Sequence, residues 1–177
     1  MSSARFLPWT IGMLSLLCHG SQSRAAEATG ASSEQKILNR ELGEWSHTCT
    51  QLKAEWTPQE TKSAVIGSYR RILGGRFVQG KLKASDGQTA LQLDTYDVER
   101  KHYRRWPFHS NGQTSEHIGK WNPDAKSMTW TGSVGGGLKS TQVDRYIGAD
   151  TLATTLLIKD ADGKVYYHLT SKSVRTK

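Results

Sequence analysis

From residue 43 to the C-terminus the chain is a series of short apolar-rich runs separated by turn residues. The runs are rich in Val, Ile, Thr, Tyr and Trp, which suit a pleated sheet, and the breaks contain Gly, Asp, Asn and Ser. Several runs alternate with period two: Val65, Gly67, Tyr69 and Leu73 share one face. About ten strands are therefore predicted, near residues 43–52, 62–73, 76–84, 89–96, 101–106, 113–121, 127–133, 138–147, 151–159 and 164–175.

All the connections between these runs are short, so neighbouring strands should pair antiparallel as hairpins. Ten up-and-down strands must hide their edges, and closure into a barrel does so. The alternative is a two-sheet sandwich, but Greek-key sandwiches need longer crossings, and the sequence contains none. We therefore predict an all-β fold, an antiparallel up-and-down barrel of about ten strands with a short N-terminal helix over residues 31–42. Ser32 or Ser33 would cap that helix, and Ile37, Leu38 and Leu42 would share one face.

The N-terminal segment has the layout of a cleaved secretory signal. Arg5 precedes an apolar run that is too short to span a bilayer, and small residues follow near Ala25, Ala26 and Ala28. An uncleaved anchor, or a lipoprotein signal with Cys18 as the modified residue, is the weaker alternative. The expected organisation is a signal peptide over 1–26, a linker and short helix over 27–42, and one barrel domain over 43–177. The expected location is periplasmic or secreted, with no membrane contact after cleavage.

Charge and cysteine content narrow the partners and the chemistry. Loss of residues 1–26 removes two arginines and no acid, so the formal charge falls from +8 to about +6. Such a mild excess on an exported protein does not favour nucleic-acid binding. Arg104 and Arg105 should face opposite sides of an extended strand. Without Cys18, Cys49 has no disulfide partner, and we interpret it as a buried apolar residue in preference to a nucleophile.

A glycine and a tryptophan stand two apart at the start of the first strand. The helix leading into Gly43 and Trp45 resembles the G-x-W signature of the lipocalin-like, or calycin, barrels. In that family the tryptophan closes one end of the barrel and packs against a cation from the last strand. The resemblance implies Lys172 or Arg175 as that cation, and a positive group over an indole gains about 0.5 to 2 kcal/mol.

Longer stretches are more specific. The segments "LNRELGEW", "ILGGRFV", "TYDVERKHY", "RRWPFHSNG" and "GKWNPDAKSMTW" resemble an uncharacterised bacterial family, DUF1579, over nearly the whole chain after the signal. The resemblance implies a lipocalin-like barrel. It brings no established activity, so it assigns no catalytic residue.

The chemistry-bearing residues form no recognisable catalytic or metal motif. No histidine pair has the spacing of a helical zinc site, although a barrel could bring His47 and His117 together to ligate a metal or a haem. We prefer to interpret both as hydrogen-bonded wall residues and expect no metal and no cofactor. The acidic residues fall mostly in turns, and no paired carboxylates stand in a recognisable setting.

The aromatic residues are the more suggestive feature, because small-molecule pockets are lined by apolar and aromatic side chains with a few polar groups. A barrel of eight or more strands can enclose such a cavity. The candidate cavity residues are Trp45, His47, Tyr69, Arg105, His117, Trp130 and Tyr167.

Three functions remain open. The first and favoured one is a binding protein for a small apolar ligand. The second is an isomerase, lyase or hydrolase that uses His47 or His117 as general base, with Tyr103 or Arg105 stabilising negative charge. The third is an interaction protein with a filled barrel and a working outer surface.

Overall fold

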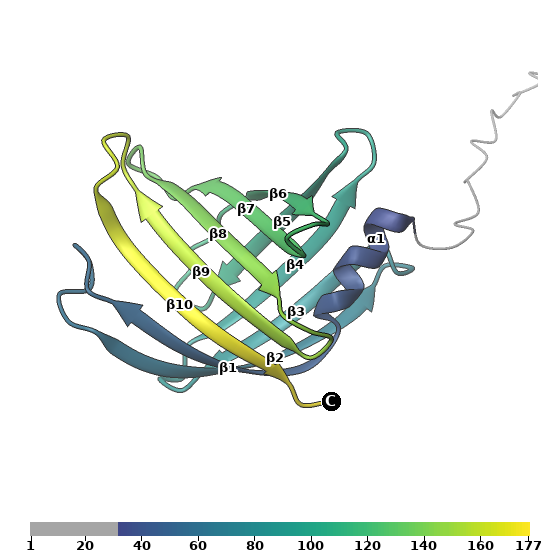
Figure 1. The fold of residues 1–177 in the computed structure, drawn as a ribbon, viewed down its shortest axis with the longest axis horizontal. Coiled ribbons are helices and arrows are strands. Elements are labelled where there is room, and N and C mark those ends of the chain that lie inside the picture. The colour runs from purple at the N-terminus through teal and green to yellow at the C-terminus, as the bar shows by residue number, and fades with distance from the viewer. Residues whose placement is uncertain (1–31) are drawn as a thin grey trace, which may run out of the picture.

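The computed structural model describes residues 32–177, which form a barrel with one short helix at its end (Figure 1). The predicted signal peptide and Cys18 lie outside the described residues. Within the described part, no helix is both long enough and apolar enough to cross a membrane.

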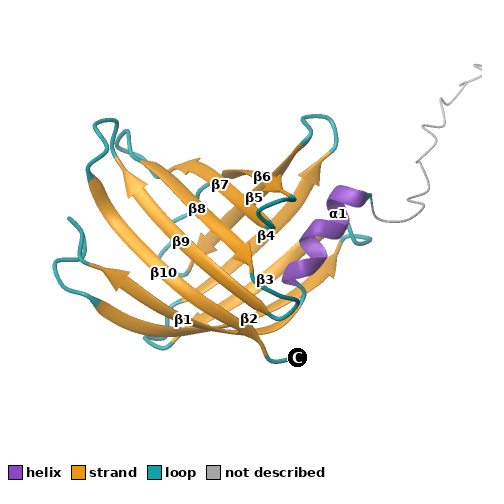
Figure 2. Ribbon diagram, in the orientation of Figure 1, coloured by secondary structure: helices purple, strands orange, loops and turns teal. Residues whose placement is uncertain are grey.

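Ten antiparallel strands close on themselves in chain order, with β1 pairing both β2 and β10. This confirms the predicted fold, and Figure 2 shows the short hairpin loops that join the strands. The elements are α1 (Ser33–Leu38), a 3-10 turn η1 (Asn39–Glu41), β1 (Gly43–Leu52), β2 (Thr61–Ile72), β3 (Phe77–Ala84), β4 (Thr89–Asp97), β5 (His102–His109), β6 (His117–Asn122), β7 (Ser127–Ser133), β8 (Lys139–Tyr146), β9 (Thr151–Lys159) and β10 (Val165–Arg175).

The hydrophobic core occupies the end of the barrel that α1 covers. Leu38 of the helix packs there against inward side chains of β3, β5 and β7, among them Val78, Met128 and Trp130. Toward the other end of β9 and β10 the inward side chains Ile158 and Tyr167 are only half-buried. The barrel is therefore filled at one end and less densely filled toward the other.

Helix α1 is fixed by its cap and by contacts with the barrel rim. The Ser32 hydroxyl accepts a hydrogen bond from the backbone N–H of Gln35 at 3.2 Å, which satisfies one of the free donors of the first turn. The Gln35 side chain donates to the carbonyl oxygen of Arg76 at 2.9 Å, and the Tyr103 hydroxyl donates to that of Glu34 at 3.1 Å. These contacts place the end of the helix, and with it η1, over the barrel.

The glycine and the tryptophan of the G-x-W stretch each have a separate structural role. Gly43 has a φ of +110° and lies so close to the backbone of Lys177 that a Cβ atom would collide with it. The Trp45 indole N–H donates to the carbonyl oxygen of Glu41 at 2.8 Å, and the Arg175 guanidinium lies 4.4 Å from the centre of its ring. Arg175 is thus the cation over the indole, whereas Lys172 is exposed on the outer face of β10.

Several element boundaries differ from the prediction, among them the end of β5, which is His109 instead of residue 106. β6 begins at His117 instead of residue 113, and β5 pairs with it only over Tyr103–Arg105 before continuing beside β4 to His109. β2 ends at Ile72, so Leu73 lies in a turn with a φ of +50° and is exposed instead of sharing the inward face.

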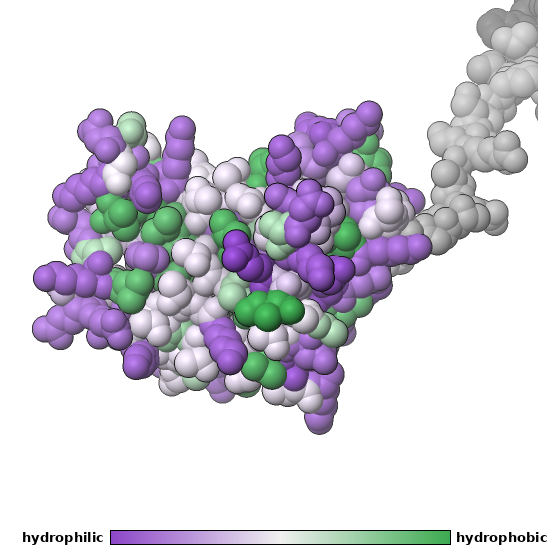
Figure 3. All heavy atoms as spheres, in the orientation of Figure 1, coloured by the Kyte–Doolittle hydropathy of each residue, from purple (hydrophilic) through white to green (hydrophobic). Residues whose placement is uncertain are grey.

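The outer surface is mixed. On the face shown in Figure 3, hydrophilic side chains gather around α1 and at the loops, and hydrophobic side chains are scattered between them.

Candidate functional site

A buried arginine stands at the centre of the site. Alternation along β5 turns Arg105 into the barrel and Arg104 to the outside, as the sequence predicted. Arg104 pairs there with Glu116 and Asp97 and lies over the Trp106 ring. Arg105 has only 6% of its surface exposed.

Three acidic side chains from separate elements surround the Arg105 guanidinium. Its Nε donates to Asp94 Oδ1 of β4 at 3.0 Å, and its Nη1 donates to Asp144 Oδ2 of β8 at 3.3 Å. Its Nη2 donates to both Asp94 Oδ2 and Glu41 Oε1 of η1, each at 2.8 Å. The guanidinium also lies 4.0 Å from the centre of the Trp130 ring. All three nitrogen atoms of the guanidinium are therefore engaged by carboxyl groups.

Neighbouring amides hold the two aspartates in place. On β4, Gln92 Nε2 donates to Asp94 Oδ2 at 2.8 Å, and on β8 Gln142 Nε2 donates to Asp144 Oδ1 at 2.9 Å. Both strands thus carry the same Q-x-D pattern with both side chains inward. Asp144 also accepts from the Trp130 indole N–H at 3.0 Å and from the Thr154 hydroxyl at 2.7 Å. Buried charges persist where their hydrogen bonds are satisfied in this way.

The electrostatics of the cluster are unbalanced, because three carboxyl groups share one guanidinium. Burial raises the pKa of Glu41 well above its ordinary value of 4.5, and the nearby Asp94 raises it further. Burial alone would lower the pKa of Arg105, but Asp94, Glu41 and Asp144 outweigh it and hold that pKa above its ordinary value. Glu41 therefore gains a proton more readily than an ordinary glutamate does.

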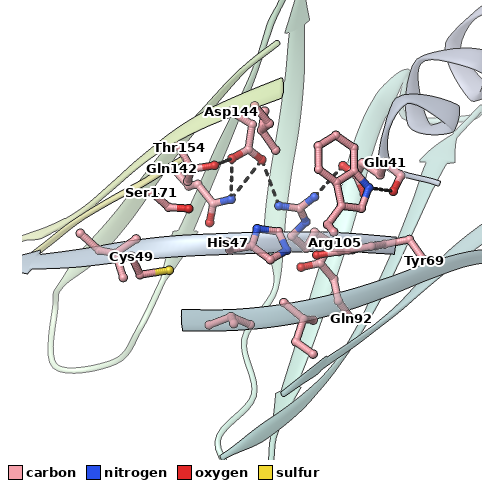
Figure 4. A pocket seen from close by; sticks show the side chains of 15 residues that line it. Glu41, His47, Cys49, Tyr69, Gln92, Arg105, Gln142, Asp144, Thr154 and Ser171 are labelled. Carbon is pink, nitrogen blue, oxygen red and sulfur yellow. Dashed lines mark hydrogen bonds and ion pairs between the residues drawn. The ribbon is translucent and has the colours of Figure 1, made fainter. Parts of the chain in front are cut away.

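A cavity of about 190 Å³ lies against this cluster inside the barrel (Figure 4). Its polar wall consists of Glu41, His47, Tyr69, Gln92, Arg105, Gln142, Asp144, Thr154 and Ser171. Its remaining wall consists of Trp45, Cys49, Val65, Leu82, Leu152 and Leu169. The cavity therefore offers both hydrogen-bonding groups and an apolar surface to one occupant.

Two buried polar atoms of the lining residues have no hydrogen-bond partner among residues 32–177. They are Oε2 of Glu41 and Nε2 of His47. The other ring nitrogen of His47, Nδ1, lies 2.7 Å from the Ser173 hydroxyl oxygen. Burial lowers the pKa of His47, although the negative charge of Asp144 opposes this, so the imidazole is neutral at pH 7. A buried polar atom without a partner carries a desolvation cost that a ligand can remove.

Four of the seven residues predicted to line the cavity do so, and three do not. Trp45, His47, Tyr69 and Arg105 line the cavity. Trp130 has no exposed surface and packs in the core against Arg105. His117 and Tyr167 point inward on β6 and β10 but lie outside the cavity lining.

The two histidines that the sequence paired lie on opposite walls. β1 and β6 are separated by four strands in either direction around the barrel. His117 contacts the Ser140 hydroxyl with its Nε2 at 3.3 Å, and burial together with Arg105 lowers its pKa. Within residues 32–177, no three His, Cys, Asp or Glu side chains are placed to hold a metal ion. Cys49 is buried, and burial raises the pKa of its thiol, as for a small apolar wall residue.

The acidic residues of the site are what sequence reasoning missed. The expectation that acids fall in turns and form no pair was wrong for Glu41, Asp94 and Asp144, which are almost wholly buried. The sequence carries no plain signal for them. Gln92 and Asp94 alternate with Leu91 and Leu93, and Gln142 and Asp144 flank Val143, so apolar periodicity alone would turn the polar side chains outward. Glu41 lies outside the strands.

Comparisons with known proteins place the chain in a family and a fold. Two solved structures have similar folds. Rv2717c from M. tuberculosis is 14% identical with a TM-score of 0.63, and the match covers 84% of this chain and 100% of that one. The S-type phycobiliprotein lyase CPES from Guillardia theta is 12% identical with a TM-score of 0.55, and the match covers 81% of this chain and 93% of that one. The curated proteins contain no match. The family of proteins of unknown function DUF1579 matches residues 30–175. The chain therefore belongs to the DUF1579 family.

Proposed function

We propose that this barrel binds a small molecule in its interior, with an apolar body against the leucine and valine wall and a polar end at the Glu41 and His47 side. One observation carries the proposal: the cavity combines an apolar surface with two buried polar atoms that no described residue satisfies. Ligand sites typically have this combination. It adds a polar end to the small apolar ligand expected from the sequence.

The size of the cavity limits what it can enclose. A cavity of about 150 Å³ in another protein accommodates benzene, so about 190 Å³ takes one ring with a small substituent. A larger ligand would have to extend along β9 and β10 toward the less densely filled end. The filled barrel of the interaction hypothesis fits a cavity of this kind poorly.

The test is to purify the protein, extract it with organic solvent and identify small molecules by mass spectrometry. Val65→Phe places a ring in the cavity, whereas Ile66→Phe changes the neighbouring outward residue of β2, which is 62% exposed. We expect a small molecule in extracts of the native protein and of Ile66→Phe, and its loss from Val65→Phe. Equal amounts from all three, or none from any, would contradict the proposal.

Catalysis in the same cavity is the second candidate, favoured by the free Nε2 of a neutral His47. Such an imidazole can accept a proton from a bound molecule. Once a ligand is identified, His47→Gln should abolish its conversion while binding persists. Prolonged incubation that returns the ligand unchanged would exclude this candidate.

A further inference from the structure

The polar end of the cavity has three acidic groups and one guanidinium, and this excess of acidic groups affects which ligands it accepts. We propose that the ligand is a small organic cation, a protonated amine on an apolar body, whose N–H groups donate to Glu41 Oε2 and His47 Nε2. The inference rests on the proposed function and specifies its ligand class.

The cluster is a poor site for an anion. A buried arginine without an acidic partner would favour a carboxylate ligand, because the two form charge-assisted hydrogen bonds. Here Nε, Nη1 and Nη2 of Arg105 already donate to Asp94, Asp144 and Glu41. A ligand carboxylate would add a fourth acidic group around one guanidinium, and like charges at this separation repel strongly where water is excluded.

Once Glu41 has lost its proton, both unsatisfied atoms accept hydrogen bonds. Glu41 is 7% exposed, its Oε1 accepts from Arg105, and its Oε2 has no partner within the described chain. When Nδ1 of His47 donates to the Ser173 hydroxyl, Nε2 of the neutral ring is an acceptor. A protonated amine carries only donors, so it satisfies both atoms and reduces the excess of acidic groups.

Binding of a cation should be coupled to loss of a proton from Glu41. The groups that bear on Glu41 are Asp94, Asp144 and Arg105 from the barrel wall, and the buried phenols Tyr69 and Tyr146. Asp94 and Asp144 favour the protonated acid, and Arg105 opposes them. A ligand cation placed beside Oε2 acts in the same direction as Arg105, so it favours the carboxylate and releases the proton to solvent.

The remaining wall determines the body of the ligand. Val65, Leu82 and Leu169 offer aliphatic contacts, and the volume of about 190 Å³ accommodates one ring. Benzylamine, benzyl alcohol and benzoate share that body and differ in the charge of the polar group.

The experiment is isothermal titration calorimetry with these three compounds at pH 7, in two buffers of different ionisation enthalpy. We expect benzylamine to bind at least about tenfold more tightly than benzyl alcohol, since hydrogen bonds to a charged group are about twice as strong as neutral ones. Benzoate should bind most weakly. The buffer dependence of the enthalpy should show proton release with benzylamine alone.

Two variants test whether Glu41 is the partner. Glu41→Gln should remove most of the preference for benzylamine and the proton release, whereas Glu116→Gln, which changes an outward acid paired with Arg104, should keep both. The proton release of the unmodified protein tests the same point if Glu41→Gln does not fold.

Failure of this inference is distinguishable from failure of the proposed function. Tightest binding of benzoate, equal binding of amine and alcohol, or a preference that survives Glu41→Gln would overturn the cation assignment while leaving interior binding in place. Binding of none of the three would overturn the assignment as well, and the extraction experiment with Val65→Phe would then decide on interior binding.

Discussion

At the residue scale, the central feature is one buried arginine held by three carboxyl groups from η1, β4 and β8. Ionic groups are costly to remove from water, and their mutual attraction compensates only when the hydrogen bonds are complete. Asp94 meets this condition with contacts from Arg105 and Gln92, and it has no exposed surface. Glu41 does not, because one of its oxygens is unsatisfied within the described chain. The difference separates a structural acid from one that is available to a ligand.

Replacement of Arg105 should be severe. Arg105→Met removes the only guanidinium that contacts the three acids in the described structure, so we expect the free energy of unfolding to fall by about 3 to 5 kcal/mol. Arg104→Met on the outer face of β5 should cost less than about 1 kcal/mol, because its ion pairs face water. Urea denaturation of the two variants measures both values. Similar losses would show that the cluster contributes nothing beyond a surface pair.

Glu41 should make stability depend on pH with a definite sign. Its pKa is raised in the folded protein, so the folded state holds the proton more tightly than the unfolded chain. That contribution is fully present below pH 4.5 and is lost as the pH rises from 4.5 through the folded-state pKa, with a slope of at most about 1.4 kcal/mol per pH unit.

Glu41→Gln removes this titration. Relative to the unmodified protein, its free energy of unfolding should therefore increase steadily above pH 4.5. Denaturation curves at several pH values measure the difference. A difference that stays constant across the range would show that Glu41 titrates normally.

The sequence reveals part of this cluster. Strand parity puts Arg104 and Arg105 on opposite faces, whereas Asp94 and Asp144 alternate with apolar residues and so do not stand out as inward side chains. Strand parity does not show which strands lie opposite each other across the barrel. The approach of Glu41 to Arg105 depends on η1 lying over the barrel end, which the local sequence around "NREL" does not encode.

At the element scale, β1, β10 and the turn after α1 together close one end of the barrel. Trp45 contacts all three: it lies on β1, its indole N–H donates to the backbone of η1, and the Arg175 guanidinium of β10 packs against the face of its ring. Arg175 also donates to Asp150 Oδ1 at 2.9 Å and to the carbonyl oxygen of Arg40 at 3.0 Å. One side chain thus links the last strand to the β8–β9 loop and to η1.

Loss of this link should be measurable. Arg175→Met should lower the free energy of unfolding by about 1 to 2 kcal/mol, the sum of a cation–π contact and one or two net hydrogen bonds. Lys172→Met on the exposed face of the same strand should change it by less than about 0.5 kcal/mol. Thermal denaturation of both variants provides the comparison, and equal effects would show that Arg175 has no special role at the barrel end.

Strand positions were predicted well because turn residues mark them. Runs bounded by Gly, Asp and Asn coincide with β3, β7 and β9 to within about one residue. The predicted start of β6 was wrong because residues 113–116 make only an isolated bridge, between Phe108 and Thr114, and do not join the sheet. Where such a strand begins depends on its hydrogen bonds to a neighbouring strand. The composition of the segment alone does not predict that pairing.

At the scale of the whole molecule, two hollows of the described barrel differ in character. One is the interior cavity, and the other is a groove of about 530 Å³ on the outer face of β2 to β5, beside Ile66, Leu91 and Phe108. The outer groove is larger, but none of its lining residues carries an unsatisfied buried atom like those of the interior. This difference supports the interior as the proposed ligand site.

Titration with toluene, followed by ¹³C methyl NMR, distinguishes the two hollows most directly. Methyl groups of Val65, Leu152 and Leu169 line the cavity alone, and those of Ile66 and Leu91 line the outer groove alone. Interior binding predicts saturable shifts at the first three residues and none at Ile66 and Leu91. Shifts confined to Ile66 and Leu91, or no saturable shift at any of the five, would contradict it.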